Sequence, residues 1–197
     1  MSVRSRIQNR CSEFGALKKQ IRMASRVSLV ACIAAVSGCG AFYPPLSTVE
    51  KVDIDRYTGR WFEIARYPNS FETGCVGVTA DYALRDDGRV SVTNTCVEGD
   101  LDGEVRTIEG VARVTDSATN AKLAVSFFFP FEGDYWILEL GDDYEYAVVG
   151  EPSRTFLWIL SRESTLDESI LEGIKSRLPD LQYDPERLEM VPQNTDQ

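Results

Sequence analysis

Apolar and polar side chains alternate along much of the chain, in short runs that turn-forming residues interrupt roughly every ten positions. In one run Val78, Ala80 and Tyr82 are apolar, while Thr79 and Asp81 between them are polar. A period of two is that of a β-strand with one face turned inward. Such runs predict eight strands, over residues 59–67, 76–84, 90–93, 104–114, 123–129, 135–140, 144–150 and 155–161.

The turn between the second and third runs predicts a hairpin. Residues 85–89 have the sequence Arg-Asp-Asp-Gly-Arg, and Asp-Gly is typical of the tight turns that join antiparallel strands. If Leu84 faces Val90, then Cys75 and Cys96 are three positions out of step in the same pairing. Either a β-bulge, or a Cys75 that lies before the strand, must absorb the difference.

A helix is predicted near the C-terminus. Thr165 and Glu168 have the spacing of a capping box, and Pro179 marks the end of the segment. Between them, apolar residues recur on one helical face: Leu166, Ile170, Leu171, Ile174 and Leu178. This stripe needs an apolar surface to cover. Residues 187–191 form a last extended piece that we expect at a sheet edge.

These elements together predict an all-β fold, an eight-stranded antiparallel up-and-down barrel with one C-terminal α-helix packed outside. Closure removes the free sheet edges, and at this strand number the interior is either filled by side chains or just holds one small ligand. A transmembrane barrel is the structural alternative. The capped helix and the charged strand positions Asp81, Glu109 and Glu139 favour a barrel that is not embedded in lipid.

The N-terminal segment has the pattern of a secretory signal. The apolar run Val27–Val36 follows two arginines and is too short to cross a bilayer, which takes about 20 residues. It ends in Val36-Ser37-Gly38-Cys39, which resembles the bacterial lipobox, whose cysteine is acylated and becomes the new N-terminus. Residues 1–38 are therefore expected to be a lipoprotein signal peptide. Translation from Met23 would shorten its basic segment, and we expect Met23 to be the start.

Processing of this kind would attach a diacylglycerol and a third acyl chain, such as palmitate, to Cys39. Two or three chains hold a protein firmly on a membrane. Gly40 follows the cysteine instead of an aspartate, and by analogy with lipoprotein sorting this favours the bacterial outer membrane. We expect residues 39–51 to be a lipidated tether, residues 52–192 the folded domain and residues 193–197 a tail.

Charge and composition exclude several classes of function. Residues 1–38 hold seven of the 21 basic residues and one of the 31 acidic residues, so 14 basic residues face 30 acidic residues in the remainder. So acidic a domain would be repelled by nucleic acid. Histidine is absent from the chain, which removes Ser-His-Asp catalysis and the commonest metal ligand. The pairs Asp86-Asp87 and Asp142-Asp143 fall in predicted turns, where Asp is favoured for backbone reasons. We therefore expect no enzyme activity, metal or cofactor.

The five cysteines divide between the signal, the anchor and the domain. Cys11 and Cys32 would leave with the signal and Cys39 would carry lipid. Cys75 and Cys96 remain, and in an oxidising envelope they are expected to form a disulfide. Two free thiols are the alternative.

At two places the residues resemble motifs of the lipocalin family. Gly59-Arg60-Trp61 matches the first motif of that family, and residues 157–162, Leu-Trp-Ile-Leu-Ser-Arg, match the last, in which an arginine ends the eighth strand. The similarity covers residues 52–191 and is greatest to the bacterial lipocalins and apolipoprotein D. The middle motif, usually Thr-Asp-Tyr, falls on Gly141-Asp142-Asp143, and this departure leaves the loop there unpredicted.

The resemblance implies a closed barrel base in which Gly59, Trp61 and Arg162 are structural, with Arg162 over the Trp61 indole. It also implies an apolar ligand, a fatty acid or lysophospholipid, bound from the other end. Strand parity predicts the pocket wall: Val78, Ala80, Tyr82, Trp136 and Leu138. Two of these, Tyr82 and Trp136, also match positions that line the pocket of apolipoprotein D. Plain core packing of these residues is the alternative. The alternative function is that of an interaction module with a filled barrel and no ligand. Association into a homodimer is a further possibility.

Overall fold

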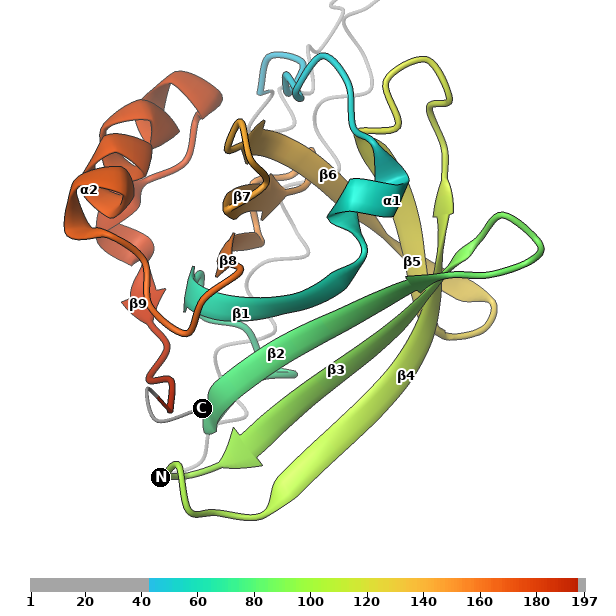
Figure 1. Cartoon of the computed structure of the whole chain (residues 1–197). Coiled ribbons are helices and arrows are strands. Elements are labelled where there is room, and N and C mark those ends of the chain that lie inside the picture. The colour runs from blue at the N-terminus through green and yellow to red at the C-terminus, as the bar shows by residue number, and fades with distance from the viewer. Residues whose placement is uncertain (1–42, 195–197) are drawn as a thin grey trace, which may run out of the picture. The chain divides into compact units, whose positions relative to one another are not determined.

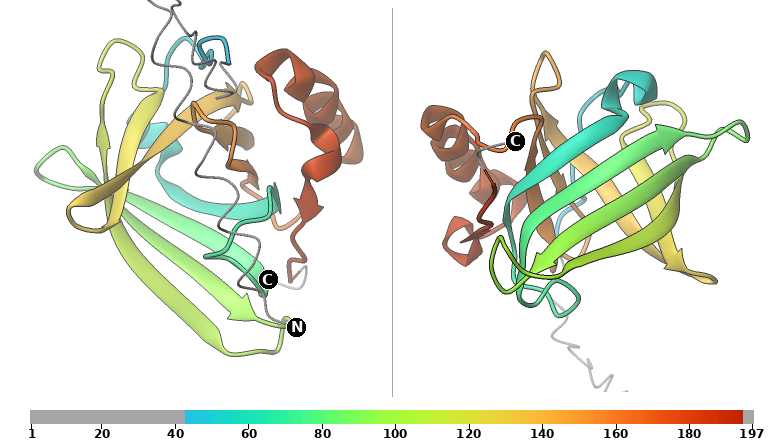
Figure 2. Two further views of the ribbon diagram at one scale, coloured as in Figure 1. Left: turned by 180° about the vertical axis from the view of Figure 1, so that it is seen from behind. Right: turned by 60° about the horizontal axis from the view of Figure 1, so that its bottom comes forward.

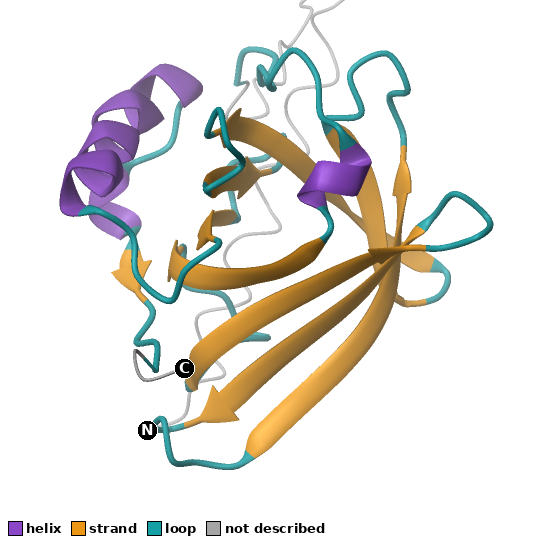
Figure 3. Ribbon diagram, in the orientation of Figure 1, coloured by secondary structure: helices purple, strands orange, loops and turns teal. Residues whose placement is uncertain are grey.

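Eight antiparallel strands close into a barrel in the computed structural model, which describes residues 43–194 (Figures 1 and 3). The strands are β1 (Gly59–Arg66), β2 (Cys75–Leu84), β3 (Val90–Glu98), β4 (Val105–Val114), β5 (Lys122–Phe128), β6 (Phe131–Leu140), β7 (Tyr146–Gly150) and β8 (Leu157–Ser161). The helices are α1 (Ile54–Tyr57) and α2 (Glu168–Arg177), with 3-10 turns at Leu178–Leu181 and Pro185–Arg187. The predicted fold class is confirmed. The expected signal peptide, the Met23 start and Cys39 lie outside the described residues.

The barrel closes because β1 pairs with strands on both sides. Gly59 lies opposite Tyr82 of β2, and Phe62 lies opposite Ser161 of β8. Beyond Phe62, β1 leaves β2, and the C-terminal segment fills the gap between them. There β9 (Glu189–Met190) pairs with β1, and the Gln193 side chain donates to the backbone oxygens of Glu63 and Val78. Gln193, which the sequence analysis assigns to the tail, is therefore part of the barrel wall.

The β2–β3 hairpin has the predicted turn and contains a bulge. Leu84 lies opposite Val90, and the register shifts between Val76 and Thr79. Gly77, with a φ of +55°, lies inside that shift, in a conformation that glycine adopts without strain. After this shift Cys75 lies opposite Glu98, so the predicted disulfide runs diagonally across the two strands to Cys96, with the two Cα atoms 5.4 Å apart.

Helix α2 covers the outer face of β6, β7 and β8 (Figures 1 and 2). The predicted apolar stripe packs there, with Ile174 fully buried against a cluster that includes Val148 and Ile159. The helix begins two residues later than a Thr165 cap would place it. Asp167 is the N-cap, and its carboxylate accepts the N–H of Ser169 at 2.8 Å.

The segment that precedes α1 packs onto the barrel. Leu46 is buried in the outer cluster, and the Val49 N–H donates to the Ile137 oxygen. Near the start of this segment, the Pro44 oxygen accepts from the Arg154 guanidinium at 2.8 Å. Within residues 43–194, no helix combines the length and the apolar character needed to cross a membrane.

Candidate functional site: the barrel interior

One end of the barrel is closed by Trp61 and Arg162. Trp61 is fully buried, and its indole N–H donates to the Tyr57 oxygen at 2.9 Å. The Arg162 guanidinium lies 3.8 Å from the centre of the Trp61 ring and donates to the Arg60 oxygen at 2.9 Å. Gly59, at a φ of +92°, lets β1 begin here, where a Cβ would lie 3.3 Å from the guanidinium. The structure thus places these residues in a closed base.

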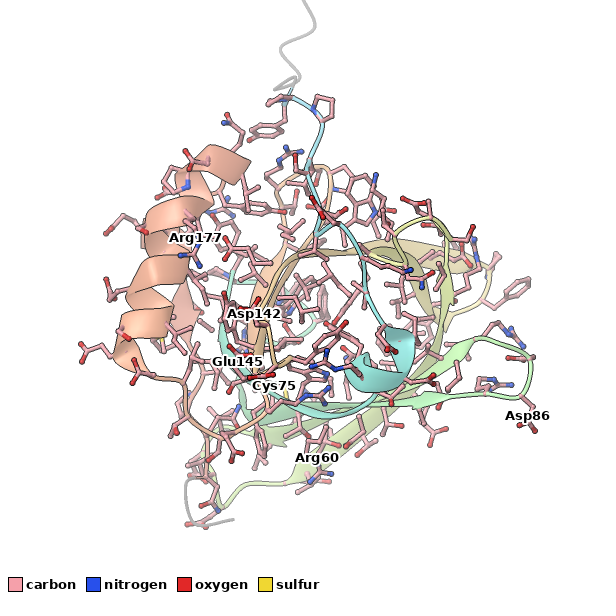
Figure 4. The ribbon with its side chains drawn as sticks, turned by 45° about the horizontal axis from the view of Figure 1, so that its top comes forward. Arg60, Cys75, Asp86, Asp142, Glu145 and Arg177 are labelled. Atoms are coloured by element: carbon pink, nitrogen blue, oxygen red, sulfur yellow. A yellow bond between two sulfur atoms is a disulfide. The ribbon has the colours of Figure 1, made fainter. Side chains whose placement is uncertain are left out.

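The one-turn helix α1 completes the base. The Asp53 carboxylate accepts the N–H groups of Asp55 and Arg56, and the Tyr57 ring packs on Trp61 with their centroids 5.0 Å apart. The loop after β6, labelled by Asp142 in Figure 4, lies against this helix, and the Arg56 guanidinium donates to the Asp142 oxygen. The unusual sequence of the middle motif therefore leaves the base closed.

The opposite end of the barrel is formed by four loops, and we call it the mouth. Strand direction puts the β1–β2, β3–β4, β5–β6 and β7–β8 connections there, away from α1. The β2–β3 hairpin, with Asp86 at its tip, is on the base side (Figure 4). A ligand that enters the barrel must therefore pass these four loops.

The inner face is mainly apolar. Its buried side chains form one cluster with Trp61: Val90, Val92, Ala112, Leu123, Ile137, Val149 and Leu160. Of the predicted pocket residues on β2, Ala80 lies beside Trp61 and Tyr82 packs on this cluster. Val78 is buried near the mouth, against the disulfide and Val191. Tyr82, Val125 and Phe127 remain partly exposed although they pack on the inner cluster.

Trp136 and Leu138 do not line the interior, so the predicted wall is wrong on β6. Both pack in the outer cluster beneath α2, and Leu138 is 6 % exposed. The inward residues of β6 are Tyr135, Ile137 and Leu140, which belong to or pack on the inner cluster. A register shift between Ile137 and Glu139 then places Leu138 under α2 and lets Glu139 reach Arg177.

Three tyrosine hydroxyls form a polar group inside the barrel, near the base. The Tyr135 hydroxyl lies 2.8 Å from that of Tyr57 and 3.0 Å from that of Tyr82. Burial raises the pKa of Tyr82 to about 12, and it raises the pKa values of Tyr57 and Tyr135 as well. The hydroxyls are therefore neutral at physiological pH. Asn94 lies opposite Ala80, and its buried Oδ1 has no hydrogen-bond partner within the described part of the chain.

A buried glutamate–arginine pair, which the sequence analysis did not predict, faces the interior closer to the mouth. Glu63 and Arg66 lie opposite Leu160 and Trp158, which belong to the inner cluster. They are 4 % and 8 % exposed, and Arg66 Nη1 lies 2.7 Å from Glu63 Oε1. The signal in the sequence is a pair of opposite charges three residues apart in a stretch that is otherwise apolar from Trp61 onward.

The surroundings of Glu63 favour its protonated form. The pKa of its carboxyl is raised to about 8, mainly by burial and then by the charge of Glu72, while Arg66 acts in the opposite direction. Arg66 also donates to the backbone oxygens of Glu72 and Cys75, each at 3.1 Å. The pair therefore ties the β1–β2 loop to the barrel wall. Among residues 43–194, no three His, Cys, Asp or Glu side chains are grouped so that they could hold a metal ion.

Comparison with known proteins agrees with this architecture. A family model described as a lipocalin-like domain matches residues 52–193. The outer membrane lipoprotein Blc of Vibrio cholerae is 36 % identical over 85 % of this chain and 98 % of its own length, and that of Escherichia coli K12 is 42 % identical over 68 % and 77 %.

Two further matches are animal proteins, the first by sequence and the second by fold. Bovine apolipoprotein D is 34 % identical over 77 % of this chain and 81 % of its own. The structure of insecticyanin from the tobacco hornworm, Manduca sexta, has the same fold, with a TM-score of 0.62 at 23 % identity over 77 % of this chain and 86 % of its own. The family match and the bacterial relatives show that the chain is a member of the lipocalin family.

Proposed function

We propose that this lipocalin is anchored to the bacterial outer membrane and binds a small apolar ligand, a fatty acid or a lysophospholipid, inside the barrel. It would store or carry that ligand in the cell envelope, without a catalytic role. The bacterial relatives are named outer membrane lipoproteins. Cys39 in its lipobox-like context supplies the anchor in this proposal.

The observation that carries the ligand proposal is the partial exposure of the inner face. Side chains of a filled barrel would be buried by one another. Tyr82, Val125 and Phe127 instead pack on the inner cluster and stay partly exposed. Apolar side chains that face inward and yet remain accessible are typical of a ligand cavity.

The polar groups inside the barrel favour an amphiphilic ligand. The three tyrosine hydroxyls bond to one another, whereas Asn94 Oδ1 is a buried acceptor without a partner among the described residues. A buried acceptor is usually satisfied by a donor or by water. A hydroxyl donor on an amphiphilic ligand would satisfy this acceptor, while the alkyl chain would lie on the apolar wall.

Organic extraction of the protein purified from its membrane, followed by mass spectrometry, tests the ligand proposal. We expect a reproducible fatty acid or lysophospholipid in the extract. The competing function is an interaction module with a filled barrel. An empty barrel that also takes up no added fatty acid or lysophospholipid would favour that function.

The anchor is tested separately. We expect the N-terminal peptide of the mature protein to begin at an acylated Cys39, and a Cys39→Ser chain to lose that modification. An unmodified Cys39 in the membrane-bound protein would contradict the anchor without affecting the ligand proposal.

A further inference from the structure

The tip of the β5–β6 hairpin exposes three phenylalanine rings. Phe128, Phe129 and Phe131 are 70 %, 93 % and 77 % exposed, and Pro130 lies between the last two. We call Phe128–Phe131 the phenylalanine tip. A contiguous group of exposed large apolar side chains marks a contact with a membrane or a partner more often than a free surface. Phe127, directly before it, packs inside the barrel.

The chain enters the described structure at the same end of the barrel. Arg154 belongs to the β7–β8 loop at the mouth, is 4 % exposed, and donates to the Pro44 oxygen. Its guanidinium also lies 5.1 Å from the centre of the Tyr43 ring. Cys39 precedes Tyr43 by four residues, which span at most about 14 Å when extended. An acyl anchor on Cys39 would therefore hold the bilayer near the mouth.

Charge favours one kind of lipid surface over another. The phenylalanine tip has no charged residue, but the neighbouring β3–β4 connection carries three acidic side chains, Asp100, Asp102 and Glu104, beside the exposed pair of Glu98 with Arg106. Anionic lipids would repel this loop, whereas a zwitterionic surface would not.

We propose that the phenylalanine tip inserts into a zwitterionic phospholipid surface and holds the mouth of the barrel against the bilayer. The tip is on the hairpin beside the β7–β8 loop, so the tip and the anchored chain would contact the same bilayer. A lipid could then move between the bilayer and the interior without crossing water. The orientation rests on the proposed anchor, whereas insertion of the tip does not.

Vesicle co-sedimentation tests the insertion. Residues Ala41–Gln197 form a compact unit of their own, and this piece lacks Cys39, so its binding does not depend on acylation. With vesicles of phosphatidylcholine and phosphatidylethanolamine, we expect Phe129→Ser to weaken partitioning about tenfold. Leu84→Ser is the matched control, because Leu84 is 50 % exposed at the base side of the barrel. Leu84→Ser should leave partitioning unchanged. Phosphatidylglycerol added to the vesicles should weaken partitioning of the unchanged protein.

Two outcomes would overturn the proposal. One is equal partitioning of the unchanged protein and Phe129→Ser, and the other is no partitioning of either. If equal partitioning is accompanied by self-association without vesicles that Phe129→Ser abolishes, the tip is instead a contact between two copies. Ligand extraction is a separate measurement, so failure of the insertion would be distinguishable from failure of the proposed lipid binding.

Discussion

The guanidinium carbon of Arg162 lies 3.8 Å from the centre of the Trp61 ring, and the same group donates to the backbone oxygens of Arg56 and Arg60. One side chain at the end of β8 thus holds α1, the start of β1 and the buried indole together. The base is closed by these contacts, and a ligand must enter from the other end.

Arg162→Lys should destabilise the fold and leave ligand affinity unchanged. Lysine keeps the charge but lacks the planar fork that reaches both backbone oxygens while stacking on the indole. We expect the free energy of unfolding to fall by about 2 kcal/mol, measured by urea denaturation. Arg60→Lys is the control, because its pair with Asp81 is exposed and contributes about 0–1 kcal/mol. Equal losses in both variants would contradict the role of Arg162.

Stability should decrease as pH rises from about 4.5 to about 8, because the pKa of Glu63 is raised to about 8 in the folded protein. In this window the folded state keeps the proton that the unfolded chain releases. The stabilisation is therefore complete below the unfolded pKa and is lost as pH approaches the folded one. The slope from this group is at most about 1.4 kcal/mol per pH unit.

Urea midpoints measured across this range should thus fall in the unchanged protein and fall less in Glu63→Gln. The amide cannot titrate but can still accept from Arg66. If the two pH profiles have the same slope, Glu63 does not keep its proton in the folded state.

Reduction, or the double change Cys75→Ser and Cys96→Ser, should lower the free energy of unfolding by about 3 kcal/mol. The disulfide closes a loop between residues 21 positions apart, and its loss lets the unfolded chain gain entropy. Thermal unfolding with and without reductant measures the effect. A change below about 1 kcal/mol would mean that the bulge around Gly77 holds this part of the hairpin without the bond.

Leu138→Ala should reduce stability but not ligand affinity, because Leu138 packs beneath α2. Loss of a buried leucine typically costs about 2–5 kcal/mol. Denaturation and ligand titration on the same sample separate the two effects. A weakened affinity with unchanged stability would mean that Leu138 lines the pocket.

Much of the fold could be predicted from the alternation, the Asp-Gly turn and the helical stripe, because each is a local pattern with one structural meaning. Two local features were missed for physical reasons. Helix α1 has a single turn, which is too short to show a helical period. The capping-box spacing predicts the N-cap at Thr165, whereas the N-cap is Asp167. Both side chains offer an acceptor before the same apolar stripe, so the pattern does not distinguish them.

The wall of the site was harder to predict than the fold. Helix α2 covers the outer face of β6, so both faces of that strand are apolar and alternation does not show which one points inward. The register shift near Leu138 also changes the parity. On β1, a second shift between Glu63 and Ala65 brings Arg66 to the same face as Glu63. Pairings between distant strands decide these positions, and a single sequence does not contain them.

Adjacent residues of β5 offer the most direct test of a ligand inside the barrel. The Phe127 ring packs on the inner cluster against Gly110, where a Cβ would lie 2.7 Å from the ring, whereas Phe128 is 70 % exposed. In fluorescence titrations with a fatty acid and a lysophospholipid, both below their micelle concentrations, Phe127→Ala should weaken binding about tenfold, and Phe128→Ala should not change it. Equal effects of the two substitutions, or no saturable binding by the unchanged protein, would contradict a ligand site in the barrel interior.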